Sequence, residues 1–144
     1  MFEQWKVLHV DEVESESILF CRALAHEQFA GHCESVRSFA EGKAYVERAL
    51  YTPQTLSRPD IIVINWHRDH NEDVLSFIHW VRTQPQLRET PLVVFITSQL
   101  PQAEQDRAQS SGVAEMIVRA DDFDSLSDQV HDLLERCASR VVAR

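Results

Sequence analysis

The chain alternates between short apolar runs and longer segments in which apolar residues recur every three or four positions. The short runs predict strands, and the recurring positions predict helices with one apolar face. The run at 61–64 is apolar throughout, as expected of a strand buried on both faces of a sheet. The predicted strands lie at about 5–10, 34–39, 61–64, 91–97 and 114–118, and the predicted helices at about 18–29, 41–51, 74–81, 101–111 and 121–137.

This order of elements predicts an α/β fold. Five strands that alternate with five helices favour a parallel sheet covered by helices on both faces. The length of 144 residues suits one hydrophobic core, so we expect a single domain over residues 1–144. Ligands of such sheets bind at the carboxyl ends of the strands, where the strand order reverses. The residues that directly follow each strand are therefore the candidates for chemistry.

Composition and charge narrow the classes of partner. The formal net charge is −9, and an acidic surface repels both nucleic-acid backbones and anionic membranes. No apolar run approaches the roughly 20 residues that span a bilayer, and the first residues lack the pattern of a signal peptide. We therefore expect a cytoplasmic protein that binds neither nucleic acid nor membranes. Basic protein surfaces and divalent cations remain as partners.

The three cysteines, Cys21, Cys33 and Cys137, share no short spacing. An odd number of cysteines without a ligand motif favours buried or spectator thiols over a disulfide or a zinc site. We expect these thiols to stay reduced.

Polar residues stand at the ends of four predicted strands. They are Asp11 and Glu12 after the first strand, Asn65 after the third, Thr97 after the fourth and Arg119 after the fifth. Carboxylates such as Asp11 and Glu12 suit a divalent cation. A hydroxyl and a guanidinium, together with backbone N–H groups, suit an anion. One polar residue at a strand end is expected of any chain that leaves the core, whereas four in this order are a stronger signal.

A histidine adds a weaker metal candidate. His67 is a possible third ligand beside Asp11 and Glu12. His67 and His70 match no standard ligand motif, however, and an exposed polar loop is the preferred interpretation of this segment.

Four segments resemble the receiver domains of response regulators, the CheY-like family. These segments are 10–12 (Val-Asp-Glu), 59–66 (Pro-Asp-Ile-Ile-Val-Ile-Asn-Trp), 88–98 and 112–119. Together they extend over nearly the whole chain, and their order and spacing are more specific than any one of them. The resemblance implies a flavodoxin-like sheet of five parallel strands in the order 2-1-3-4-5, with helices on both faces.

The resemblance also implies a phosphorylation site. In the receiver family a histidine kinase donates a phosphoryl group to an aspartate at the end of the third strand. An acid pair, matched here by Asp11 and Glu12, holds Mg²⁺, and a lysine at the position of Arg119 neutralises charge. A hydroxyl at the position of Thr97 and an aromatic residue at the position of Met116 change conformation when the domain is phosphorylated. The face formed by the fourth helix, fifth strand and fifth helix then changes its partners. The resemblance thus implies a signalling domain and not an enzyme.

The chain departs from the family where phosphorylation requires a specific side chain. Asn65 stands at the phosphoacceptor position, and a carboxamide is not a competent nucleophile there. Asn65 also offers only a neutral oxygen, so Mg²⁺ held by Asp11 and Glu12 is expected to bind weakly at most. Arg119 replaces the lysine, and we expect it to enter the pocket and pair with Asp11.

We therefore expect an atypical receiver that signals without phosphorylation, through contacts with a histidine kinase or another regulator. A homodimer through the face of the fourth helix, fifth strand and fifth helix is a further expectation. Two alternatives stay open. The first is that the protein accepts phosphate on another residue, such as Asp11, Glu12, Asp69 or Ser98, and acts in phosphotransfer, with Asp69 the preferred candidate. The second is that the chain is a receiver domain cut from a larger regulator.

Overall fold

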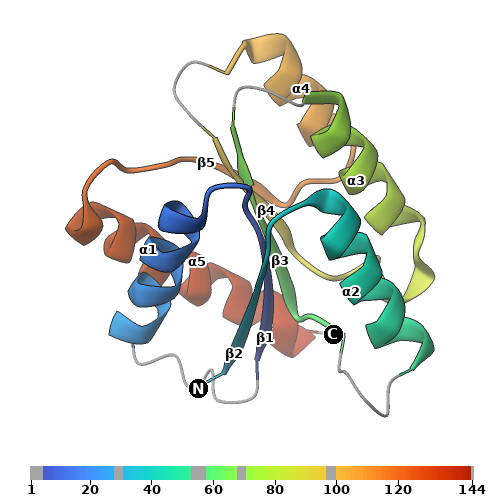
Figure 1. Cartoon of the computed structure of the whole chain (residues 1–144), viewed down its shortest axis with the longest axis horizontal. Helices are drawn as coiled ribbons and strands as arrows, with labels where there is room; N and C mark the ends of the chain where they lie inside the picture. The colour runs from blue at the N-terminus through green and yellow to red at the C-terminus, as the bar shows by residue number, and fades with distance from the viewer. Residues whose placement is uncertain (1–4, 28–30, 53–57, 68–70, 97–99, 144) are drawn as a thin grey trace.

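The structure is a computed structural model (Figure 1) that describes residues 5–27, 31–52, 58–67, 71–96 and 100–143, with the backbone alone at residues 71 and 138–143. In this part of the chain, five strands alternate with five α-helices and one short 3-10 helix. The elements in chain order are β1 (Lys6–Val10), α1 (Glu14–His26), β2 (His32–Val36), α2 (Phe39–Tyr51), β3 (Ile61–Trp66), α3 (Asn71–Thr83), η1 (Pro85–Leu87), β4 (Leu92–Ile96), α4 (Gln102–Ser110), β5 (Glu115–Val118) and α5 (Phe123–Ala143).

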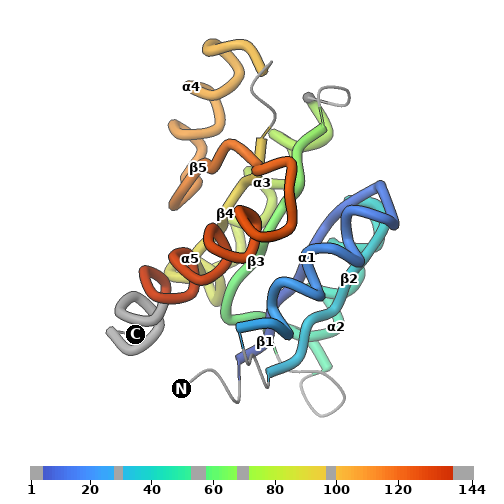
Figure 2. Tube along the Cα trace, turned by 90° about the vertical axis from the view of Figure 1, so that its left-hand side faces the viewer, coloured from blue at the N-terminus to red at the C-terminus, as the bar shows by residue number. Residues whose placement is uncertain are grey.

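The strands form one parallel sheet in the order β2-β1-β3-β4-β5, which confirms the predicted topology. β1 pairs with β2 on one side and with β3 on the other, so that Val10 lies beside both Val36 and Ile64. The strand order therefore reverses at β1 and β3, and their carboxyl ends meet at the point where such sheets bind ligands. α1 and α5 cover one face of the sheet, and α2 and α3 cover the other (Figures 1 and 2).

Each face of the sheet has its own apolar core. Alternate residues of a strand point to opposite faces, so Ile62 and Ile64 pack toward α2 and α3, while Ile61 and Val63 pack toward α1 and α5. All six residues of β3 are consequently buried. No helix in the described part of the chain has the length and apolar character needed to cross a membrane.

The second strand ends earlier than predicted, at Val36, because a helix cap intervenes. Ser38 Oγ accepts a hydrogen bond of 3.1 Å from the backbone N–H of Glu41, and the Glu41 carboxylate accepts one of 2.6 Å from the backbone N–H of Arg37. This reciprocal cap, a serine with a glutamate three residues later, fixes the start of α2 at Phe39. It outweighs the preference of Phe39 for a strand.

The third strand extends further than predicted and includes Asn65 and Trp66. Asn65 pairs in register with Phe95, and Trp66 with Ile96. Trp66 is fully buried in the core beneath α2 and α3. Asn65 therefore does not sit on a loop, and the ladder between β3 and β4 holds it rigidly.

α4 has little apolar surface. Ala108 is its one buried residue. An ion pair of 3.0 Å between Arg107 and Glu72 of α3 joins the two helices, but exposed pairs of this kind contribute little stability. We expect α4 to be the easiest helix to displace from the sheet.

Arg82 of α3 holds two connecting segments in place. Its guanidinium donates hydrogen bonds to the carbonyl oxygens of Leu87 and Thr90, each at 2.9 Å. It also donates two hydrogen bonds, of 2.9 and 2.7 Å, to the carbonyl oxygen of Gly112. Gly112 has a φ of 105°, which residues with a side chain rarely adopt. One planar donor group thus joins the approach to β4 with the turn before β5.

Replacing Arg82 by lysine is expected to lower the free energy of unfolding by about 2 kcal/mol, because a single ammonium group cannot serve all these carbonyls at once. Urea unfolding of Arg82→Lys measures this loss. Arg22→Lys, at an exposed position of α1, is the matched control and is expected to stay within about 0.5 kcal/mol of the wild type. Equal losses in the two variants would contradict the role assigned to Arg82.

Candidate functional site

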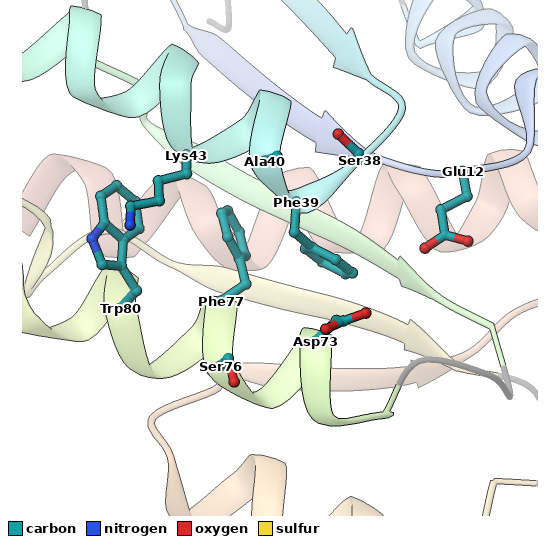
Figure 3. A pocket seen from close by; sticks show the side chains of 9 residues that line it. All are labelled: Glu12, Ser38, Phe39, Ala40, Lys43, Asp73, Ser76, Phe77 and Trp80. Atoms are coloured by element: carbon teal, nitrogen blue, oxygen red, sulfur yellow. The ribbon is translucent and has the colours of Figure 1, made fainter.

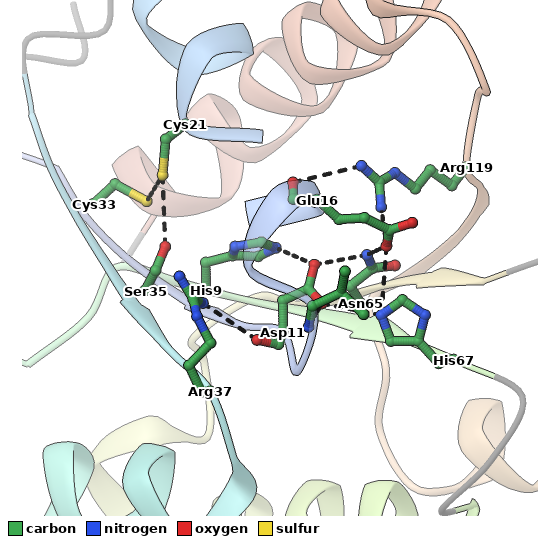
Figure 4. Close-up of polar contacts among 11 residues, drawn as sticks. His9, Asp11, Glu16, Cys21, Cys33, Ser35, Arg37, Asn65, His67 and Arg119 are labelled. Carbon is green, nitrogen blue, oxygen red and sulfur yellow. Dashed lines mark hydrogen bonds and ion pairs between the residues drawn. The ribbon is translucent and has the colours of Figure 1, made fainter. Parts of the chain in front are cut away.

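The buried carboxylate of Asp11 is the centre of a polar cluster at the carboxyl end of the sheet (Figure 4). Asp11 directly follows β1 and is 1% exposed. Its Oδ1 accepts hydrogen bonds from the backbone N–H of Val13 at 2.9 Å and from Nε2 of His67 at 3.0 Å. Burying an ionised carboxylate without such donors is strongly unfavourable, so these contacts are a condition of folding.

Asn65 contributes both hydrogens of its side-chain amide to this cluster. Nδ2 donates to Asp11 Oδ2 at 2.8 Å and to Glu16 Oε2 at 2.7 Å. The amide nitrogen must face these oxygens, because the amide oxygen is itself an acceptor. An aspartate here would put a third carboxylate against two others with no donor between them. The amide therefore bridges two acids, a role that a cation would otherwise fill.

Arg119 enters the cluster from the end of β5, as expected, but its partner is Glu16 and not Asp11. The guanidinium forms a close ion pair with the Glu16 carboxylate and lies 3.5 Å from the backbone oxygen of Glu16. The side chain of Arg119 is 14% exposed, so it does not point away into solvent. The two oxygens of Asp11 already accept hydrogen bonds from Val13, His67 and Asn65, whereas Glu16 lies closer to the surface on the side where Arg119 enters. The predicted ion pair between Arg119 and Asp11 is therefore wrong, and Arg119 pairs with Glu16 instead.

Glu12, the second member of the predicted acid pair, lies outside the cluster. It is exposed, and its carboxylate lies at the rim of a surface hollow of about 510 Å³ between α2 and α3, whose walls include Phe39 and Trp80 (Figure 3). Glu16 joins Asp11 in its place. Glu16 was not predicted, because it does not directly follow a strand. The first turn of α1 brings it back over the end of the sheet.

Asp11, Glu16 and His67 form a group that can hold a metal ion, since one ligand atom of each lies within 4.8 Å of the others. His67 was predicted in such a group, while Glu16 replaces Glu12. A cation entering here would have to displace the contacts of Asn65 and Arg119 with the same carboxylates. Two carboxylates and an imidazole also suit a transition metal better than Mg²⁺, which prefers oxygen ligands. The residues thus fit Mg²⁺ poorly.

His9 lies under the cluster, inside the core, and sequence reasoning did not select it. Its ring stacks on Phe20 with centroids 4.2 Å apart, and its Nε2 lies 3.9 Å from Asp11 Oδ2. Burial lowers the pKa of His9 to about 4, against the opposing effect of Asp11. His9 is therefore neutral near pH 7. Arg37 closes the other side of the cluster by donating to the backbone oxygen of Asp11 at 3.2 Å.

The remaining predicted residues divide into two groups. Met116, on β5, is partly buried and packs against the core beneath α2 and α3. Thr97 lies outside the described residues, as do Ser98, Asp69 and His70. The predictions for these four residues stay predictions.

No protein-family model matches the sequence, and no curated protein matches it.

Solved structures match over nearly the whole chain. The phosphorylated cyanobacterial phytochrome response regulator RcpA has a TM-score of 0.80 at 22% identity, covering 94% of this chain and 95% of its own. The Mn²⁺-bound response regulator Rcp1 has a TM-score of 0.75 at 17% identity, covering 90% and 91%. The chemotaxis response regulator CheY4 of Vibrio cholerae has a TM-score of 0.68 at 19% identity, covering 91% and 99%. The fold is that of receiver domains.

At these identities the likeness to receiver domains establishes the fold alone. The chemistry has to be argued from the cluster itself. In this receiver fold, Asp11 and Asn65 stand at the ends of the two strands where the order reverses, as the sequence predicts. Glu16, His67 and Arg119 complete the cluster around them.

The low pKa of His9 predicts a loss of stability as the pH falls. Between pH 6.5 and about 4 the unfolded chain protonates His9 while the folded chain does not, so each step down in pH favours unfolding. From pH 7.5 to pH 5, His9 is expected to account for a loss of about 2 kcal/mol in the free energy of unfolding. Urea unfolding in the presence of a chelator measures it at the two pH values.

The difference between the wild type and His9→Gln isolates this contribution, because glutamine does not titrate. The variant is expected to lose about 2 kcal/mol less than the wild type over the same pH interval. His79→Gln, at an exposed position of α3, should follow the wild type. Parallel pH profiles for wild type and His9→Gln would show that His9 titrates normally in the folded protein.

Proposed function

We propose that this chain is a receiver-type signalling module that works without phosphorylation, by binding other proteins. The observation that carries the proposal is the side chain at position 65. It is a carboxamide whose two N–H groups are both engaged, with Asp11 and Glu16. An amide cannot attack phosphorus to form the acyl phosphate that a carboxylate forms.

The neighbouring carboxylates are poor substitutes for a phosphoacceptor. Both oxygens of Asp11 accept hydrogen bonds inside the protein, and Glu16 is occupied by Asn65 and Arg119. Attack in line with the leaving group requires an oxygen that is exposed and correctly oriented. The contacts around Asp11 and Glu16 therefore support a pocket that is insensitive to phosphate.

The cluster also supports a conformation that needs no metal. RcpA was solved phosphorylated and Rcp1 with Mn²⁺ bound. Here the Asn65 amide bridges Asp11 and Glu16, and the Arg119 guanidinium pairs with Glu16, all from within the chain. We propose that these two side chains hold one signalling conformation permanently, and that Mg²⁺ binds weakly at most.

The proposed interaction surface is the face formed by α4, β5 and α5. β5 is an edge strand, and its Val118 is 53% exposed. Gln129 of α5 fastens this strand by donating to the Val118 carbonyl oxygen at 2.7 Å and by accepting from the backbone N–H of Ala120 at 3.0 Å. An ordered edge strand with an apolar side chain suits pairing with another protein. A histidine kinase or another regulator is the proposed partner, and a second copy of this chain can use the same face.

Incubation with acetyl phosphate and Mg²⁺ followed by intact-mass spectrometry tests the central proposal. The natural protein is expected to gain no phosphoryl group, because Asn65 offers no nucleophilic oxygen. The variant Asn65→Asp restores a carboxylate at this position and serves as the positive control. It is expected to gain one phosphoryl group.

A phosphoryl group on the natural protein would overturn the proposal and favour the phosphotransfer alternative. The modified residue would then be mapped by peptide sequencing. Asp69, Asp11, Glu12 and Ser98 would be the positions to compare.

Self-association tests the proposed face. An aspartate at an apolar contact loses its hydration without gaining a partner, so Val118→Asp is expected to weaken dimerisation by about tenfold or more, or roughly 1.4 kcal/mol. Sedimentation equilibrium over a range of protein concentrations measures the dissociation constant. Ile18→Asp is the matched control, since Ile18 is 44% exposed on α1, which is not part of this face. Weakening by Ile18→Asp alone would move the interface to α1.

A further inference from the structure

Cys21 and Cys33 lie side by side where α1 packs against the edge strand β2 (Figure 4). They are twelve residues apart in sequence, and their Sγ atoms are 3.6 Å apart. A disulfide requires sulfur atoms at about 2.0 Å, so the two atoms must approach each other by roughly 1.5 Å to form the bond. The fold therefore brings together two thiols that the sequence spacing does not pair.

Small oxidants can reach this pair. Both side chains are partly exposed, whereas Cys137 is fully buried. Cys21 and Cys33 line an open surface hollow of about 440 Å³ together with Arg22 and Arg37. Reactive cysteines in proteins are found in partly exposed, positively charged surroundings of this kind, while buried thiols are inert.

The surroundings of the two sulfurs give them different roles. Cys21 Sγ lies next to the Cys33 thiol and 3.5 Å from the Ser35 hydroxyl. The hydrogen bond between the two thiols is the main cause that lowers the pKa of Cys21. Burial opposes this shift, while the Ser35 hydroxyl and the charge of Arg37 add to it. The same hydrogen bond and burial raise the pKa of Cys33. The lowered pKa favours Cys21 as the attacking thiolate, and the raised pKa favours Cys33 as the thiol that keeps its proton.

A metal site does not explain the pair. A structural zinc ion requires four ligands, and within the described residues no group of three or more metal-binding side chains includes either cysteine. Redox chemistry requires only the two sulfurs that are present.

We propose that Cys21 and Cys33 form a redox-active dithiol, which hydrogen peroxide converts to an intramolecular disulfide. The Cys21 thiolate attacks one peroxide oxygen, the O–O bond breaks, and the departing hydroxide takes up a proton to leave as water. Cys21 is then a sulfenic acid. The Cys33 sulfur attacks the Cys21 sulfur, the S–O bond breaks, and the hydroxyl group leaves as a second water with the Cys33 proton. The two sulfurs together lose two electrons, and the peroxide gains them.

Peroxide treatment of the full chain followed by intact-mass and non-reducing peptide analysis tests the proposal. The wild type is expected to lose the mass of two hydrogen atoms, to yield a peptide linked through Cys21 and Cys33, and to recover its mass with a thiol reductant. Cys137→Ala, which retains both partners, is the matched control and should behave identically.

The variant Cys33→Ala separates the two roles. It cannot form the disulfide, so Cys21 should stop at the sulfenic acid and gain a dimedone adduct, and Cys21→Ala should give neither product. A wild type that stays unmodified, or is oxidised only to sulfinic acid, or links through Cys137, would overturn the proposal. This test does not depend on whether the protein accepts phosphate, because neither cysteine takes part in the cluster around Asp11.

Discussion

The burial of one charged group, the Asp11 carboxylate, determines the arrangement of the site. An ionised carboxylate that is 1% exposed must find donors inside the protein. Three come from different parts of the chain: the backbone of Val13, the His67 ring and the Asn65 amide. The hydrogen bonds to the Asp11 carboxylate thus fix the turn after β1 and the end of β3 relative to each other. A hydrogen bond to a charged group of this kind typically contributes about 1.5–3 kcal/mol.

Asn65 couples this requirement to the rest of the cluster. Its second N–H group reaches Glu16, and Glu16 in turn holds Arg119 at the end of β5. The cluster therefore joins β1, α1, β3 and the end of β5 through the Asn65 amide and the ion pair between Glu16 and Arg119. Two carboxylates face one guanidinium, and the amide separates the acids without adding charge. In such an arrangement an added cation competes with hydrogen bonds and an ion pair that are already formed.

The fold was predictable because apolar runs buried on both faces, such as 61–64, identify parallel strands directly. The strand ends then indicated Asp11, Asn65 and Arg119, and the structure brings these three residues into one cluster. Glu16 was not predictable in this way, because its position depends on the path of α1 over the sheet. The contact between Cys21 and Cys33 is likewise a product of packing and not of spacing. The sequence pattern identifies the residues at strand ends, whereas the packing of the helices on the sheet determines which other side chains lie beside them.

The dithiol and the cluster around Asp11 both involve α1 and the segment that follows β2, so the two sites could be coupled. Glu16 lies in the first turn of α1, and Cys21 lies further along the same helix. Arg37, just beyond β2, lines the hollow of the dithiol and also donates to the Asp11 carbonyl oxygen. Coupling between two sites requires an element with two positions that both sites bias. Closing the disulfide needs only a movement of the two side chains, and the Arg37 contact is to a backbone oxygen that oxidation does not alter. Glu16 and Asp11 should therefore keep their partners when the dithiol is oxidised, and the cluster should not respond to the redox state of Cys21 and Cys33.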